Sequence, residues 1–77
     1  MAEDFLNRIE IDVDKLGGKP VIKGTRIPVA LIIELIANGL EPDEIIKEYP
    51  ELTIEDIKAA LLYAARLAEN EVVLTLE

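Results

Sequence analysis

The chain has 77 residues, 51% of them hydrophobic, and a net charge of −8 at pH 7. A chain of this length holds one hydrophobic core, so we expect a single domain over residues 1–77, and the hydrophobic content argues against disorder. The absence of cysteine and histidine excludes disulfides and thiolate metal sites and removes the commonest general base. We therefore predict a non-catalytic protein with no metal, no cofactor and no small-molecule substrate.

The cellular location is predicted from the apolar segments. The N-terminal residues 1–5 lack the basic start and the apolar run of a secretory signal. The longest apolar stretch, over residues 27–36, is broken by Glu34 and is too short to span a bilayer. We expect a cytoplasmic protein that does not bind membranes.

The first predicted elements are two short strands. Over residues 8–13 apolar side chains alternate with acidic ones, which is the pattern of a half-buried strand. A glycine pair that predicts a turn follows, and then a second short strand over residues 20–24. We expect Ile9, Ile11 and Val13 to share the buried face of the first strand.

Three helices are predicted next, over residues 28–38, 42–49 and 53–69. Apolar residues on one face of the first helix are Val29, Ile32, Ile33, Ile36 and Leu40. The third helix opens with Thr53-x-x-Asp56, which resembles a capping box with Asp in place of the usual Glu or Gln. Its predicted inward stripe comprises Ile54, Ile57, Leu61, Ala64, Ala65 and Ala68.

Residues 72–76 form an apolar run of strand type. We expect them to form a short final strand that pairs either within the chain or between two chains. The tight connection between the second and third helices is compatible with a helix-turn-helix. The predicted fold class is therefore mainly α, with a short N-terminal β-hairpin and a three-helix unit.

Positive charge is concentrated in one segment. The four cations Lys15, Lys19, Lys23 and Arg26 fall within residues 15–26, which contain no acid and carry a charge of +4. The rest of the chain then carries −12, because −8 minus +4 is −12. Two interpretations stay open: a surface that contacts nucleic-acid phosphate or an acidic protein, or a pair of solvated turns.

Negative charge is concentrated in the second and third helices. Residues 41–56 contain seven acids and one lysine, a local charge of −6. In a helix-turn-helix the third helix would read DNA, and we expect Glu55, Asp56, Lys58 and Ala59 to be its outward residues. Acids there would repel phosphate. Adjacent acidic pairs at helix starts are explained by the helix dipole, so no metal site is predicted.

Four apolar side chains lie off the predicted inward stripes of their helices: Leu31, Leu35, Leu62 and Tyr63. One interpretation is a wide contact inside a compact three-helix unit. The other is the surface of a homodimer or of a complex with another protein.

Three motifs together resemble a known family. They are GGKPVIKGTRIPV over residues 17–29, GLEPDEII over residues 39–46, and YPELTIEDI with AAL over residues 49–61. In this order they resemble a small bacterial and archaeal family named only as domain of unknown function number four-three-three. The resemblance covers about residues 9–66.

The resemblance implies a helix-turn-helix fold of the winged or homeodomain-like kind. It also implies the antitoxin half of a toxin–antitoxin pair, which binds and silences a nuclease of the PIN type and represses the promoter of the pair. The alternative function is a stand-alone transcription regulator that binds DNA as a dimer. The acidic third helix argues against that alternative.

Overall fold

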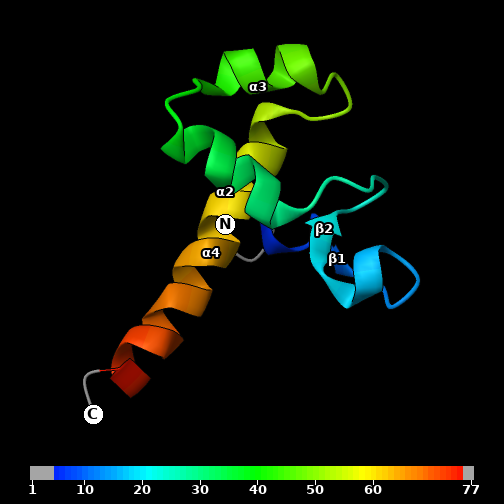
Figure 1. Cartoon of the computed structure of the whole chain (residues 1–77). Helices are drawn as coiled ribbons and strands as arrows, with labels where there is room; N and C mark the ends of the chain where they lie inside the picture. The colour runs from blue at the N-terminus through cyan, green and yellow to red at the C-terminus, as the bar shows by residue number, and fades with distance from the viewer. Residues whose placement is uncertain (1–4, 76–77) are drawn as a thin grey trace.

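The computed structural model describes residues 5–75 of the chain, and for residues 70–75 it describes the backbone only (Figure 1). In chain order the elements are β1 (Ile9–Ile11), the 3-10 turn η1 (Leu16–Gly18), β2 (Pro20–Ile22), α2 (Val29–Ala37), α3 (Pro42–Glu48) and α4 (Ile54–Thr75). The fold is thus mainly helical with a short antiparallel hairpin before three helices, which confirms the predicted fold class.

The hairpin is held on both edges of β2. On one side β2 pairs with β1, with Ile9 opposite Ile22 and Ile11 opposite Pro20. On the other side the Ile22 N–H donates to the Ile27 carbonyl at 3.0 Å, next to a bridge between residues 21 and 28. The strand β2 is therefore the middle of a small three-segment ladder that leads directly into α2.

Both strands are shorter than predicted, because residues 8 and 12–13 lie outside β1 and residues 23–24 lie outside β2. Pro20 explains why β1 ends at Ile11, since the proline that pairs with Ile11 has no N–H to donate to the neighbouring strand. At the other end Gly24, at φ +81°, forms a turn in which the Thr25 N–H donates to the Ile22 carbonyl.

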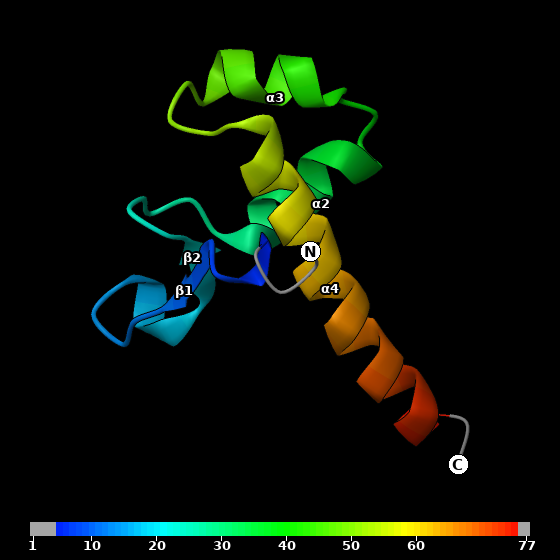
Figure 2. The same ribbon diagram turned by 180° about the vertical axis from the view of Figure 1, so that it is seen from behind.

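The predicted buried face of β1 is wrong beyond its first residue. Ile9 packs against the core, whereas Ile11 is 62% exposed and Val13 is 80% exposed. Figures 1 and 2 show the reason: the hairpin projects sideways from the helices, so no helix packs against its far end.

One core joins the three helices to the base of the hairpin. Its buried side chains are Ile22, Ile27, Val29, Ile32, Ile45, Leu52, Ile57 and Ala60. The helix α2 crosses α4, and α3 lies across the N-terminal end of α4 (Figures 1 and 2). The predicted apolar face of α2 is confirmed, because all five of its residues are buried or packed against this core.

The start of α4 has the predicted capping box. The Thr53 N–H donates to Asp56 Oδ2 at 3.0 Å, and the Asp56 N–H donates to Thr53 Oγ1 at 3.2 Å. The predicted inward stripe is confirmed at Ile57 and is wrong at four of its residues, which are exposed: Ile54, Leu61, Ala65 and Ala68. The buried residues of α4 are Asp56, Ile57, Ala59 and Ala60. The buried face is thus turned toward the hairpin as well as toward α2.

The strand predicted over residues 72–76 is also wrong. Residues 72–75 belong to α4, which continues to Thr75, and residue 76 lies outside the described residues. A helix that has been nucleated gains one hydrogen bond for each residue added, so the Ala- and Leu-rich stretch over residues 59–68 favours a helix that continues through residues 72–75. Among the helices that the structure describes, none is long and apolar enough to cross a bilayer.

Candidate functional site

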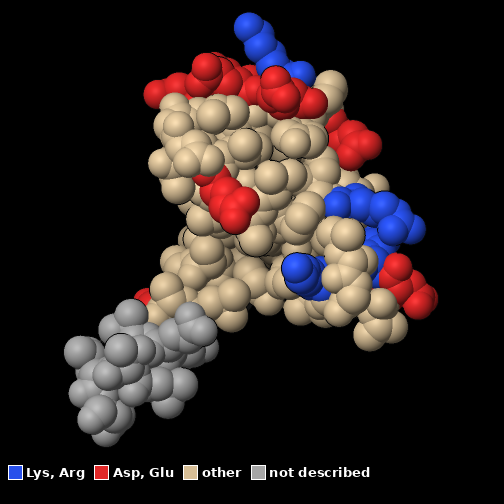
Figure 3. Space-filling view, in the orientation of Figure 1, with Lys and Arg blue, Asp and Glu red and all other residues tan. Residues whose placement is uncertain are grey.

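Basic side chains gather over the hairpin and the turn that follows it. Figure 3 shows Lys and Arg on this side of the molecule, with acidic side chains beside them, while over α3 at the top acidic side chains crowd around one basic side chain. Lys19, Lys23 and Arg26 are exposed. Among the side chains that the structure describes, none of these three is paired with a carboxylate. We call Lys19, Lys23 and Arg26 the basic cluster.

Lys15, the fourth predicted cation, is engaged within the hairpin. Its Nζ donates to Glu10 Oε1 at 3.0 Å and to the Thr25 carbonyl at 3.4 Å. The hydrogen bond from Lys15 lowers the pKa of the Glu10 carboxyl below its ordinary value. Lys15 therefore ties β1 to the turn after β2, and its charge is balanced locally.

The turn that carries the basic cluster is fixed by a threonine. Thr25 Oγ1 donates to the Ile22 carbonyl at 2.8 Å and accepts from the Ile27 N–H at 3.0 Å. These two bonds close the turn from both sides. Lys23 and Arg26, which flank Gly24 and Thr25, therefore extend from a backbone of defined shape rather than from a loose loop.

Asp56 does not face outward as predicted. It is only 7% exposed, and its Oδ1 accepts from Arg8 Nη1 at 3.1 Å while its Oδ2 caps the helix. One oxygen thus joins the segment before β1 to α4, and the other caps the start of α4. Ala59 is buried as well, so the outward residues at this end of α4 are Ile54, Glu55 and Lys58.

The remaining acids of this region are exposed on α3 and around it. They are Glu41, Asp43, Glu44, Glu48, Glu51 and Glu55. Glu44 has a structural part, because its Oε1 accepts from the Glu41 N–H at 2.7 Å at the start of α3. Among the described residues, no three acidic side chains come together as metal ligands would.

The four apolar residues predicted to lie off the inward stripes are in two places. Leu31, Leu35 and Tyr63 are partly buried and pack against the core, which favours the interpretation as a wide core contact. Leu62 lines a shallow hollow with Phe5, and Lys58 Nζ lies 5.9 Å from the centre of the Phe5 ring.

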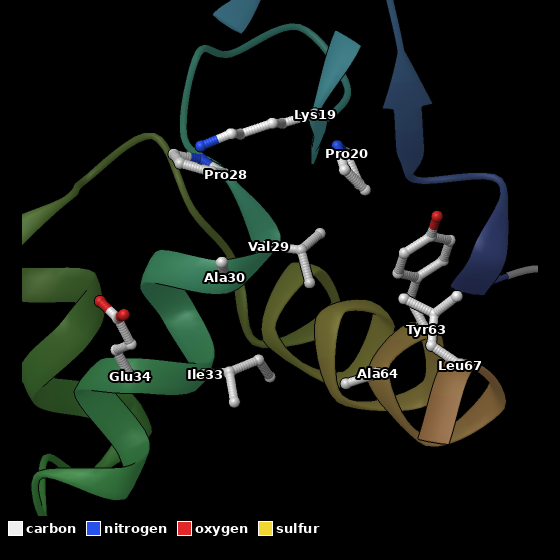
Figure 4. Close-up of a pocket in the computed structure, with 10 residues that line it drawn as sticks. All are labelled: Lys19, Pro20, Pro28, Val29, Ala30, Ile33, Glu34, Tyr63, Ala64 and Leu67. Atoms are coloured by element: carbon white, nitrogen blue, oxygen red, sulfur yellow. The ribbon is translucent and has the colours of Figure 1, made fainter. Parts of the chain in front are cut away.

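An apolar groove that the sequence did not predict lies between the hairpin, α2 and α4 (Figure 4). Its volume is about 500 Å³. Its walls are formed by Pro20, Pro28, Val29, Ala30, Ile33, Tyr63, Ala64 and Leu67, with Lys19 and Glu34 as the charged lining residues. The residues come from three distant segments of the chain, so no local pattern indicates that they meet.

Comparisons with known proteins agree with the three motifs. Residues 9–64 match the family described as "Protein of unknown function (DUF433)". The crystal structure of a DUF433 member protein from Anabaena variabilis ATCC 29413 has a TM-score of 0.77 and 31% identity to this chain, covering 97% of this chain and 74% of that one.

A second relative is much longer. The uncharacterized protein y4eO from Sinorhizobium fredii (strain NBRC 101917 / NGR234) is 39% identical over 51 residues, which are 66% of this chain and 23% of that protein. This chain therefore spans less than a quarter of that curated relative. The family match runs from the start of β1 to the middle of α4, which is more than half of the chain. The chain belongs to the DUF433 family.

Proposed function

We propose that the chain is a non-catalytic binding module, the antitoxin half of a toxin–antitoxin pair, which works in the cytoplasm and binds and silences a PIN-like nuclease. The observation that carries this proposal is the basic cluster, which lies on a projecting hairpin of an otherwise acidic chain. The resemblance of the chain to antitoxin-like proteins, through its three motifs, supports the same role.

The chemistry of such a partner matches the basic cluster. A nuclease of this type holds its metal ions with a group of carboxylates, and these form a negative surface when exposed. Lysine and arginine side chains opposite carboxylates steer association and fix the orientation of a complex. Arginine adds a planar fork that binds a carboxylate through two parallel hydrogen bonds, which gives Arg26 a particular part in the contact.

The rigidity of the hairpin supports this role. Binding costs less free energy when the binding groups are already held in place. The Thr25 bonds and the Lys15 contacts fix the turn that carries Lys23 and Arg26. Only the side chains of the cluster then lose freedom on binding.

The alternative function, a dimeric DNA-binding regulator, is supported by the same cations and by the three-helix unit with a wing-like hairpin. The basic cluster would then contact phosphates. The exposed acids at the starts of α3 and α4 oppose it, because Glu55 lies where a reading helix would approach the groove. We therefore favour the nuclease as the direct partner, with promoter repression as a property of the pair.

The test is co-purification with the nuclease encoded beside the gene. We expect a stable complex that suppresses nuclease activity. Reversing both charges with Lys23→Glu and Arg26→Glu should weaken the complex by roughly 10- to 100-fold in Kd. The matched control is Lys47→Glu, which reverses an exposed lysine on α3 and should leave Kd unchanged. Recovery of no complex with the wild-type chain would overturn the proposal.

A DNA-binding measurement separates the alternative. Fluorescence anisotropy with the promoter duplex at low salt should show little binding by the chain alone. Tight binding that falls steeply with salt and is lost in the Lys23→Glu, Arg26→Glu variant would instead favour the regulator.

A further inference from the structure

The C-terminal half of α4 extends past the core. The helix has 22 residues, and its last buried side chain is Ala60 among those that the structure describes. Residues 65–69 are all exposed, and the helix continues to Thr75. Figures 1 and 2 show this half leaving the body of the molecule. We call residues 65–75 the α4 extension.

A packing partner would add to the stability of the α4 extension. Isolated helices shorter than about 12–15 residues are marginal in water, and most helical stability in proteins comes from packing of an apolar face. The α4 extension is continuous with a capped, packed helix, which nucleates it, but its exposed residues make no core contact. Its Leu67 is 48% exposed, a large apolar side chain at the point where the helix leaves the body.

The apolar groove begins at that same point. Leu67 and Tyr63 form its wall on α4, facing Ile33 on α2 (Figure 4). The groove and the first turn of the α4 extension therefore form one continuous apolar strip.

We propose that a second copy of this chain covers that strip, so that each α4 extension lies in the groove of the other protomer. A two-fold arrangement makes the contact isologous, because the same patch both offers a helix and receives one. Leu67 of each copy then enters the groove of its partner, as an apolar anchor does when a helix binds in a groove.

The charges around the strip suit this pairing. On the α4 extension Arg66 and Glu69 flank Leu67, and both are exposed. Around the groove the charged residues are Glu34 and Lys19. Arg66 on the helix can therefore pair with Glu34 at the groove of a second copy, and Glu69 can pair with Lys19. Such complementarity selects one orientation of the partner helix.

The dimer is independent of the nuclease contact. It uses Leu67, Glu34 and Arg66, whereas the proposed function is tested at Lys23 and Arg26. Lys19 alone belongs to both regions, so it is left unchanged in both sets of variants. Failure of either proposal can thus be recognised while the other stands.

The experiment is light scattering of the full chain at concentrations from about 5 to 500 µM. One protomer has a mass of 8.5 kDa, so the wild type should give twice that value at the upper concentrations. Leu67→Arg places a charge in the apolar strip and should weaken dimerisation at least ~10-fold. Leu61→Arg is the matched control, since Leu61 is 43% exposed on the other flank of the same helix, and it should stay dimeric.

A charge exchange gives a second readout. Glu34→Arg should weaken the dimer, and adding Arg66→Glu to it should restore part of the loss. Circular dichroism checks that each variant is folded. A wild-type chain that stays monomeric at 500 µM would overturn the proposal, and so would a dimer lost in Leu61→Arg but kept in Leu67→Arg. A monomer whose Leu67→Arg variant no longer binds the nuclease would assign the groove to that partner and equally overturn it.

Discussion

The hairpin and the helices of this chain are held in place by different forces. The helices share a core in which Ile32 and Ile45 are fully buried. The hairpin reaches that core at Ile9 and Ile22, but its far end lies outside it, with Ile11 and Val13 exposed, and is shaped by polar contacts such as that between Lys15 and Glu10. A chain with apolar residues throughout thus divides into a part that burial stabilises and a part that hydrogen bonds shape.

The two regions also differ in charge, and the difference bears on function. Residues 15–26 carry +4, while residues 41–56 carry −6. Side chains on a projecting element can be exchanged for binding with little loss of core packing, whereas core residues are constrained by packing. We therefore expect substitutions in the helices to change mainly stability, and substitutions in the hairpin to change mainly binding and local shape.

The largest expected effect is in the core. Ile45→Ala removes most of a fully buried side chain that joins α3 to the rest of the molecule, so it should lower the free energy of unfolding by about 2–5 kcal/mol. The matched hairpin substitution Ile11→Ala should lower it by less than ~0.5 kcal/mol, since that side chain is 62% exposed. Urea denaturation followed by circular dichroism measures both. Similar losses in the two variants would contradict the division between the regions.

The next effect concerns the link between the two regions. Asp56→Ala removes the helix cap and leaves Arg8 without its partner, so we expect a loss of about 1–3 kcal/mol in the free energy of unfolding. Asp56→Asn keeps an acceptor for the Thr53 N–H and should lose less. The control is Glu55→Ala, an exposed neighbour on the same turn, which should change stability little. Equal losses in the alanine variants at 55 and 56 would show that the Asp56 contacts contribute nothing.

What the sequence predicted correctly depended on neighbouring residues. The capping box joins residues three apart, and the apolar face of α2 repeats every three or four residues, so both could be read locally. The three motifs were likewise sufficient to identify the family. The overall order of two strands and three helices followed from these signals.

What the sequence did not predict depended on distant residues. Asp56 is buried in contact with Arg8, which lies 48 positions away in the chain, and no local pattern indicates this contact. The apolar groove needs Pro20, Ile33 and Leu67 together, which no local pattern indicates. The composition of the apolar run at 72–76 is typical of a strand, but residues 72–75 are the last residues of α4.

The smallest expected effect lies wholly within the hairpin. The Lys15 ammonium lowers the pKa of the Glu10 carboxyl, so the folded chain holds this carboxylate ionised to a lower pH than the unfolded chain does. The contact therefore stabilises the fold at pH values above the ordinary glutamate pKa of about 4.3, and this stabilisation is lost as the pH falls through the lowered value.

Lys15→Met removes the ammonium and keeps an unbranched apolar chain of similar length, so the pKa of Glu10 should rise toward its ordinary value. An NMR titration that follows the Glu10 carboxyl carbon measures this directly, with Lys47→Met on α3 as the control that should leave that pKa unchanged. Because the contact is partly open to solvent, its effect on global stability should be small, and the change should be confined to the hairpin. An unchanged Glu10 pKa in Lys15→Met would mean that the contact does not shape the hairpin in solution, and the basic cluster would then be carried by the Thr25 turn alone.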